Sequence, residues 1–378
     1  MTTSLCFSPL RRQSHRGGDG ARSVTANRQT GLARSSLRLF HRLGGNRLLH
    51  HLWPSRLTVL AYHRIADTSR SDFVGFAANV SATATSFDAQ LRWLRQHFHI
   101  VSLDEVLEWL DGNTTLPNNP ALITFDDGYK DMLDAALPVL RRHAAPAALF
   151  LATDCVGSSK PFFWDLAAYC FHHTARCEAF LPLTGSIAWS DEPGRRQALH
   201  EWITAAKALP CEALPAAGAA LASALQVLVP EDAFRHLHLS WDDVRVLARS
   251  GVAIAGHTRS HAILSRIPAA QARAEMVESK RQIEAEVGVV VRAFAYPNGL
   301  ADDYRPQDVA ILRDEGFTAA FTLADGPSTL AAVHRHPLEI RRVLVMADDD
   351  EAAFSARLVG LTRFVHSIRK KVSWKFSD

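Results

Sequence analysis

Short apolar runs alternate with helical patterns along most of the chain from about residue 56 onward. This alternation is typical of strand–helix units built around a parallel sheet, so the sequence predicts an α/β fold. Seven apolar runs are predicted to be strands: Leu57–Tyr62, Ala121–Phe125, Ala147–Leu151, Val252–Ala255, Ala293–Tyr296, Ala319–Thr322 and Ile340–Val345.

Helical patterns fill most of the gaps between these strands. Ser86 is the expected N-cap of a helix over Phe87–His97. Ser102 and Glu105 form a capping box before a helix over Leu103–Leu110. The other expected helices cover Tyr129–Arg142, Trp241–Arg249, Gln271–Val287 and Asp308–Glu315.

The chain divides into three expected parts. Residues 1–55 form a basic segment, largely disordered because its first 35 residues are rich in Arg, Ser, Thr and Gly without periodicity. Residues 56–355 form the α/β body, interrupted at residues 158–239 by a helical insertion rich in Ala, Leu, His and Trp. Residues 356–378 form a basic amphipathic helix, which either lies on a membrane surface or closes one end of the body.

Charge is distributed unevenly between these parts. Residues 1–55 carry nine Arg against Asp19, and residues 356–378 carry six basic side chains against Asp378, although the whole chain has a net charge of only +3. The middle of the chain is therefore acidic, which argues against a nucleic acid partner. The basic ends are either solvated or make peripheral contact with anionic lipid.

Neither a membrane-spanning segment nor an ordinary secretion signal is expected. The longest uncharged apolar stretch, residues 216–229, is shorter than the roughly 20 residues that a spanning helix needs. The N-terminus lacks a continuous apolar region before a cleavage site. Five cysteines without a CxxC pair favour reduced thiols, and we expect a cytoplasmic location or one at the periphery of the inner membrane.

Polar residues follow four of the predicted strands. These residues are His63, Asp126 with Asp127, His257, and the Pro297-Asn298-Gly299 turn. Each has an ordinary explanation, because Asp-Gly is a common turn and a single histidine is often structural. Their joint placement at carboxyl strand ends, where parallel barrels carry their active sites, favours a functional site.

Asp127, His257 and His261 together make a set of one carboxylate and two imidazoles. The four-residue spacing of the two histidines predicts that both lie on one face of a helical turn. Such a set suits a divalent metal with open positions for water and substrate: Zn²⁺ foremost, with Co²⁺, Fe²⁺, Ni²⁺ or Mn²⁺ as alternatives.

Three motifs in this order resemble those of the polysaccharide deacetylases, which are carbohydrate esterase family four or the NodB-homology domain: TFDDG at 124–128, HTRSH at 257–261 and YPNG at 296–299. The resemblance covers roughly residues 57–345. It implies a distorted (β/α) barrel of about seven parallel strands and the removal of acetyl groups from glycans with a divalent metal. It also implies that Asp127, His257 and His261 are the metal ligands and Asp126 the general base.

The first strand, LTVLAYHRI, looks like that of the poly-N-acetylglucosamine deacetylase branch of this family. That resemblance implies that His63 is the catalytic acid. Many family members use a Leu-x-His motif instead, of which this chain has no clean copy; its nearest late histidines are His334 and His336. Many relatives also carry an Arg where this chain has Ala295, so Arg292 or Arg341 either replaces it or is simply a salt-bridged strand-end residue.

Four further residues are candidates for lining the substrate site. Tyr296, Pro297 and Asn298 belong to the third motif, where a turn can aim a backbone N–H at an oxyanion. Trp164, in an aromatic run of the insertion, either stacks on a sugar ring or anchors the insertion to the barrel.

Together these features predict a hydrolase of carbon–nitrogen bonds other than peptide bonds. Its expected substrate is the N-acetyl group of amino sugars in a bacterial polysaccharide or its lipid-linked precursor. Two alternatives stay open: an inactive glycan-binding barrel, and a metal-dependent amidohydrolase of a small non-sugar amide. The polysaccharide, the native metal and the oligomeric state are not determined by the sequence.

Overall fold

A computed structural model describes residues 37–45 and 56–361 of the chain. The predicted segments 1–55 and 356–378 lie mostly outside these described residues. Residues 37–42 are helical, and Arg38 bonds Asp350 at the start of helix α13 (Glu351–Leu358) with a distance of 2.7 Å. No helix in the described ranges is both long enough and apolar enough to cross a bilayer.

Seven parallel strands close into a barrel, as the sequence predicts. They are β1 (Arg56–Tyr62), β5 (Pro120–Asp127), β6 (Ala147–Leu151), β9 (Val252–Gly256), β10 (Ala293–Ala295), β11 (Ala319–Asp325) and β13 (Ile340–Leu344). The order β1-β13-β11-β10-β9-β6-β5 is closed by pairing of β1 with β5 over five residues. The barrel is distorted, because β9 and β10 pair only at Gly256 and Phe294, and β11 shifts register against β13.

Every one of the seven strand predictions is confirmed, but some short strands are missed. Strand β4 (His99–Val101) extends the sheet beside β5, and β12 (Ser328–Thr329) pairs antiparallel with β1. A further two-stranded sheet joins β2 (Arg64–Ile65) to β3 (Val80–Ala82). These segments are too short for a hydrophobic period to be visible.

Helices surround the barrel, and all but the last of those named here lie close to their predicted positions. They are α3 (Ala84–His97), α4 (Leu103–Leu110), α5 (Leu137–Arg142), α9 (Trp241–Arg249), α10 (Ala269–Val287), α11 (Pro306–Asp314) and α12 (Leu330–Arg335). Helix α3 begins earlier than predicted because Thr83, not Ser86, is the N-cap and accepts from the Ser86 N–H. The predicted helix over Tyr129–Arg142 is also wrong at its start: a π-helical turn (Met132–Ala136) precedes α5.

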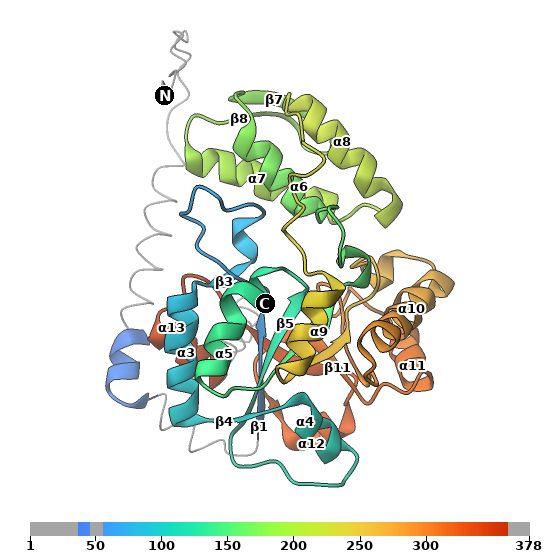
Figure 1. Cartoon of the computed structure of the whole chain (residues 1–378). Helices are drawn as coiled ribbons and strands as arrows, with labels where there is room; N and C mark the ends of the chain where they lie inside the picture. The colour runs from blue at the N-terminus through green and yellow to red at the C-terminus, as the bar shows by residue number, and fades with distance from the viewer. Residues whose placement is uncertain (1–36, 46–55, 362–378) are drawn as a thin grey trace, which may run out of the picture.

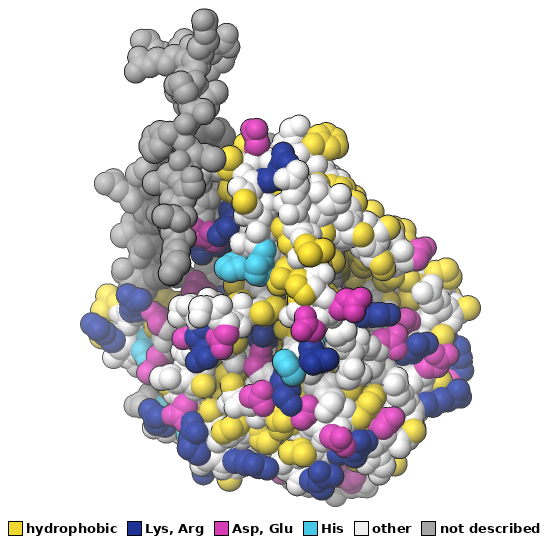
Figure 2. Space-filling view, turned by 45° about the horizontal axis from the view of Figure 1, so that its top comes forward, with side chains coloured by type: hydrophobic (Ala, Val, Ile, Leu, Met, Phe, Trp, Pro, Cys, Tyr) yellow, Lys and Arg dark blue, Asp and Glu magenta, His cyan; other side chains and the backbone are white. Residues whose placement is uncertain are grey.

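The insertion forms a separate layer above the barrel (Figure 1). It contains helices α6 (Phe163–His173), α7 (Glu192–Ala206) and α8 (Leu214–Ala224), with a core of its own around Trp202 and Phe171. It also contains a hairpin that the sequence analysis did not predict, β7 (Glu178–Leu181) with β8 (Gly185–Ala188). Figure 2 shows hydrophobic side chains gathered over this layer, above a barrel surface of mixed charge.

Candidate metal and catalytic site

The polar strand-end residues meet at one end of the barrel. Asp126 and Asp127 are the last residues of β5, His257 directly follows β9, and His63 directly follows β1. Because all seven strands are parallel, their carboxyl ends point the same way, towards the insertion.

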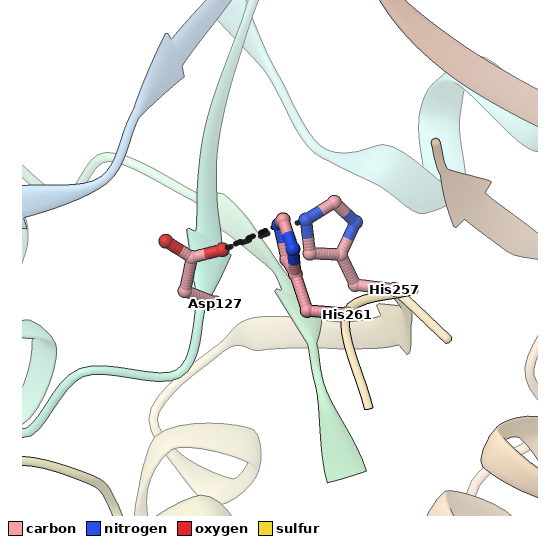
Figure 3. Close-up of side chains that lie close together, drawn as sticks. All are labelled: Asp127, His257 and His261. Carbon is pink, nitrogen blue, oxygen red and sulfur yellow. Dashed lines mark ion pairs between the residues drawn. The ribbon is translucent and has the colours of Figure 1, made fainter. Parts of the chain in front are cut away.

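Asp127, His257 and His261 converge as the sequence predicts (Figure 3). The Asp127 Oδ1 lies 3.5 Å from His257 Nε2 and 3.4 Å from His261 Nε2, and all three potential ligand atoms lie within 4.8 Å of one another. Asp127 is almost fully buried, yet neither of its carboxylate oxygens accepts a hydrogen bond within the described residues. A buried carboxylate without donors is costly, and a divalent cation would satisfy it, so these residues fit a metal.

The His257 ring is fixed in the orientation that a metal ligand requires. Its Nδ1 lies 2.7 Å from the Ala295 carbonyl, which can only accept, so Nδ1 carries the proton. The other nitrogen, Nε2, faces Asp127 and is the one that could bind a metal. In metal sites, the histidine nitrogen that does not bind the metal commonly donates a hydrogen bond to a backbone carbonyl.

The two histidines do not share a helical turn, so that prediction is wrong. Residues 257–261 form a loop in which Thr258 and His261 have φ values of +62° and +60°. Glu275 of α10 holds this loop by accepting hydrogen bonds from the Arg259 and Ser260 N–H groups at 2.8 and 2.9 Å and from the Ser260 hydroxyl at 2.8 Å. Nothing in the sequence pattern singles out Glu275, which looks like any helix carboxylate until its burial is known.

Trp164 and Phe162 pack edge-on against the His261 ring, with centroids 5.0 and 5.4 Å away. The Trp164 indole donates to the Tyr129 hydroxyl, which donates to Asp165, both at 2.8 Å. Trp164 is only 6% exposed and also stacks on Phe162 with ring centroids 4.5 Å apart, so little of its ring surface is left for stacking on a sugar. Of the two roles predicted for Trp164, its burial fits anchoring the insertion to the barrel.

Asp126 is held by a residue that the sequence analysis did not name. Arg342 of β13 donates two hydrogen bonds of 2.7 Å to the two carboxylate oxygens, and both side chains are buried. Burial alone would raise the pKa of Asp126, but the charges of Arg342 and His257 lower it below its ordinary value. Asp126 is therefore ionised at neutral pH.

The two arginines considered for this role lie elsewhere. Arg292 pairs with Asp111, and Arg341 donates to the Asp325 carbonyl at 3.3 Å. Adjacent arginines in a strand point to opposite faces, so one of Arg341 and Arg342 had to enter the barrel. The adjacent pair Arg341-Arg342 at a strand is thus the sequence signal for an arginine inside the barrel.

His63 is half-buried at the end of β1, where its backbone N–H donates to the Ser81 hydroxyl at 3.0 Å. It is close enough for its charge to help lower the pKa of both Asp126 and Asp127, against the raising effect of burial on each. By contrast, the His334 ring packs at a tilt against Trp109 of α4, and α4 and α12 lie at the end of the barrel away from the insertion. His63, unlike His334, thus lies at the same end of the barrel as Asp126.

The third motif reaches the site only in part. Tyr296 is fully buried, donates to the Leu338 carbonyl at 3.0 Å and stacks on Tyr304, contacts that favour a core role over the predicted contact with substrate. Pro297 is also buried. Asn298 is half-buried with φ of +59° and borders a cleft of about 980 Å³ that His261 also borders.

Comparison with known proteins agrees with this fold and shows the family. The sequence profile of the polysaccharide deacetylase family matches residues 113–320, more than half of the chain. The chain therefore belongs to the polysaccharide deacetylase family, whose members hydrolyse carbon–nitrogen bonds other than peptide bonds.

Two curated relatives indicate the branch of the family. The poly-beta-1,6-N-acetyl-D-glucosamine N-deacetylase of Staphylococcus epidermidis is 31% identical over 108 residues, which are 26% of this chain and 37% of that protein. The putative polysaccharide deacetylase YxkH of Bacillus subtilis is 27% identical over 105 residues, 28% of this chain and 34% of that protein. The match thus spans about a third of the length of these relatives.

Solved structures show the same fold. The Streptococcus pyogenes deacetylase PplD in complex with acetate superposes with a TM-score of 0.53 at 16% identity, covering 81% of this chain and 99% of that one. IcaB from Ammonifex degensii superposes with a TM-score of 0.51 at 21% identity, covering 80% and 98%.

Proposed function

We propose that this protein is a metal-dependent deacetylase that hydrolyses N-acetyl groups of amino sugars in a bacterial polysaccharide or its lipid-linked precursor. The observation that carries the proposal is the juxtaposition of two adjacent carboxylates in different surroundings. Asp127 faces two histidines and has no hydrogen-bond donor within the described residues, whereas Asp126 is fixed and ionised by Arg342. The relatives named for N-acetylglucosamine deacetylation support the substrate class.

Asp127, His257 and His261 would hold the metal, foremost Zn²⁺, with Co²⁺, Fe²⁺, Ni²⁺ or Mn²⁺ as alternatives. When bound there, the metal lowers the pKa of water and polarises the acetyl carbonyl. The Ala295 carbonyl orients the His257 ring, and Trp164 packs against the His261 ring. These contacts keep one nitrogen of each ring in position to bind the metal.

Asp126 and His63 divide the proton transfers. Asp126 takes a proton as the water oxygen attacks the acetyl carbon; a carboxylate has about four acceptor positions, so the two bonds from Arg342 leave room for this proton. As the carbon–nitrogen bond breaks, His63 gives a proton to the departing amine. The products are acetate and the free amino sugar, and each such transfer contributes roughly 10² to 10⁴ in rate.

The structure weighs against the two alternatives. An inactive glycan-binding barrel would rest on the missing Arg at Ala295 and the absent Leu-x-His motif, and the buried pair of Arg342 with Asp126 removes the first of these two supports. A small amide would call for a tight pocket, whereas His261 borders a cleft of about 980 Å³. We further propose that the protein acts in the cytoplasm or at the periphery of the inner membrane, which fractionation of cells into soluble and membrane pools would test.

Acetate release from N-acetylglucosamine oligomers by purified protein, with Zn²⁺, Co²⁺ or chelator, tests the proposed activity. Release should require metal and fall by at least about 100-fold in Asp126→Asn and in His63→Ala. His334→Ala is the matched control, because this exposed histidine contacts Trp109 at the other end of the barrel. Release that persists in Asp126→Asn would contradict the mechanism, and glycan binding without release by the metal-loaded protein would favour the binding barrel.

A further inference from the structure

A large apolar cleft separates the insertion from the rim of the barrel. Its volume of about 980 Å³ is near the top of the usual range for small-molecule sites, roughly 300 to 1,000 Å³. His261 and Asn298 border it, so it opens onto the candidate metal site. Its walls are mainly apolar, and include Phe162, Phe163, Leu166, Leu209, Leu214 and Val227.

Small residues on one face of α8 create this space. Gly218 lies against α6, where an added Cβ would come 2.7 Å from the Leu166 side chain, so α8 sits close to α6. Ala219 and Ala222 follow on the wall of the cleft, where larger side chains would fill it. A glycine inside a helix is unfavourable by roughly 0.5–1 kcal/mol relative to alanine. At position 218 the absence of a side chain lets α8 pack closely against α6.

The charged groups along the cleft are mostly positive. Asp154 is the one acidic residue among its lining residues, and Arg259 pairs with it and with Glu278. Lys207 and Arg266 also line the cleft; both are exposed, and neither forms a salt bridge within the described residues. Burial lowers the pKa of Lys207, the charge of Asp303 raises it, and the charge of Arg266 lowers it, so both a carboxylate and a second cation act on this side chain.

A hydroxyl-rich sugar chain does not match such walls, because burying unpaired hydroxyl groups against apolar side chains is unfavourable. A long hydrocarbon chain does match them, and unpaired cations beside it favour an anionic group at the chain's head. The cleft therefore has the chemistry of a site for an anionic amphiphile.

We infer that the substrate is an amino sugar joined through phosphate to a prenyl chain. The chain lies in the cleft between α6, α8 and the barrel, the phosphate lies beside Lys207 and Arg266, and the acetamido group reaches the Asp127–His257–His261 cluster. This inference rests on the proposed deacetylase function and names its substrate class.

Binding to metal-free protein tests the inference without depending on activity. Calorimetry would compare farnesyl phosphate, farnesol and inorganic phosphate as the probes. Farnesyl phosphate should bind at least tenfold more tightly than either of the other two, because each buried methylene contributes about fourfold in affinity and the phosphate meets the two cations. Absence of farnesyl phosphate binding, or equal affinity for inorganic phosphate, would overturn the inference.

Neighbouring residues on α8 provide a matched pair of variants. Ala219→Trp places a large ring in the cleft, whereas Ala220→Trp places the same ring on an exposed position of α8 outside the cleft lining. Ala219→Trp should weaken farnesyl phosphate binding at least tenfold and Ala220→Trp should leave it unchanged. Equal effects of the two substitutions would overturn the inference.

A separate pair of variants tests whether Lys207 and Arg266 bind the phosphate. Lys207→Gln combined with Arg266→Gln should bring the affinity for farnesyl phosphate down to that for farnesol. Arg281→Gln removes an exposed positive charge on α10, away from the cleft lining, and should not change it. An unchanged affinity in the double variant would contradict the phosphate position.

Activity then separates this inference from the proposed function. The kcat/KM for farnesyl-phosphate-linked N-acetylglucosamine should exceed that for the soluble oligomer at least tenfold, and Ala219→Trp should lower this ratio. If the oligomer is deacetylated but farnesyl phosphate does not bind, the inference alone is wrong. If farnesyl phosphate binds in the cleft but no acetate is released from either substrate, the deacetylase function is wrong and the binding site is supported.

Discussion

Arg342 of β13 and Asp126 of β5 form a buried ion pair with both nitrogen–oxygen distances at 2.7 Å. Strand β1, which ends just before His63, lies between these two strands and pairs with both. The pair thus bridges strands on either side of β1, beside the candidate acid. It sets the orientation and ionisation of the carboxylate that we assign as the base.

Replacing Arg342 should move the pH dependence of activity. Arg342→Gln removes the positive charge that lowers the pKa of Asp126, so burial dominates and that pKa rises. Because the base acts unprotonated, the acidic limb of the kcat/KM profile should shift to higher pH, with a loss of about 10- to 100-fold at neutral pH.

Breaking a buried pair also costs about 3–5 kcal/mol of stability, so a second variant is needed. Arg342→Lys keeps the charge but loses the bidentate geometry, and should lower activity with a smaller shift of the acidic limb. Arg341→Gln is the matched control on the same strand. An unshifted acidic limb in Arg342→Gln would show that the pair does not control the base.

The strands of the barrel could be predicted because they are buried on both faces. Runs such as Leu57–Tyr62 and Ala147–Leu151 are continuous apolar segments bounded by turn residues, and both are strands in the structure. Ends of elements were less predictable, because Thr83 and Ser86 both have the side chain of an N-cap and only backbone geometry decides between them. The β7–β8 hairpin was missed because its four-residue strands are short and lie in a mainly helical segment.

Residue type and position after a strand were enough to predict part of the site. Both features pointed to Asp127, His257 and His261, and the predicted convergence of these three side chains is confirmed. Arg342 and Glu275 act through contacts made across the fold, and linear spacing does not reveal such contacts. Tyr296 shows the converse, because membership of a motif did not distinguish a core side chain from one that lines the site.

Gly299 in the third motif should resist substitution more strongly than an unhindered glycine. Its φ is +67°, and an added Cβ would lie 2.7 Å from the Leu323 backbone nitrogen. Gly299→Ala should therefore lower the free energy of unfolding by about 3 kcal/mol, from left-handed strain plus overpacking.

A substitution at Gly288, at the end of α10, would measure the cost of left-handed strain without the cost of overpacking. Its φ is +76°, but an added Cβ would meet nothing within 4 Å, so Gly288→Ala should cost only about 1 kcal/mol. Urea unfolding of both variants measures the difference. Equal costs would mean that the backbone around Leu323 yields to the added methyl group.

Buried His238 should destabilise the metal-free protein in acid. Burial lowers the pKa of this imidazole to about 4, in a position where its ring packs beside Tyr129 and Phe162. Between the ordinary histidine pKa and pH 4 the unfolded chain binds a proton that the folded chain excludes, so stability falls as pH falls.

His238→Phe removes this dependence. The unfolding free energy of the variant minus that of the original protein should rise by about 3 kcal/mol between pH 7.5 and pH 4. His238→Leu should show the same trend from a lower baseline, because the ring contacts are lost. Urea unfolding at three pH values would measure the trend, and a constant difference across pH would contradict the assigned burial of the neutral ring.

We assign different roles to two adjacent carboxylates: Asp127 binds the metal, and Asp126 accepts a proton from the attacking water. The most direct test measures bound metal and acetate release together in the original protein, Asp126→Asn and Asp127→Asn. We predict that Asp126→Asn keeps its metal and loses acetate release, whereas Asp127→Asn loses both. Full metal binding by Asp127→Asn, or undiminished acetate release by Asp126→Asn, would contradict the account.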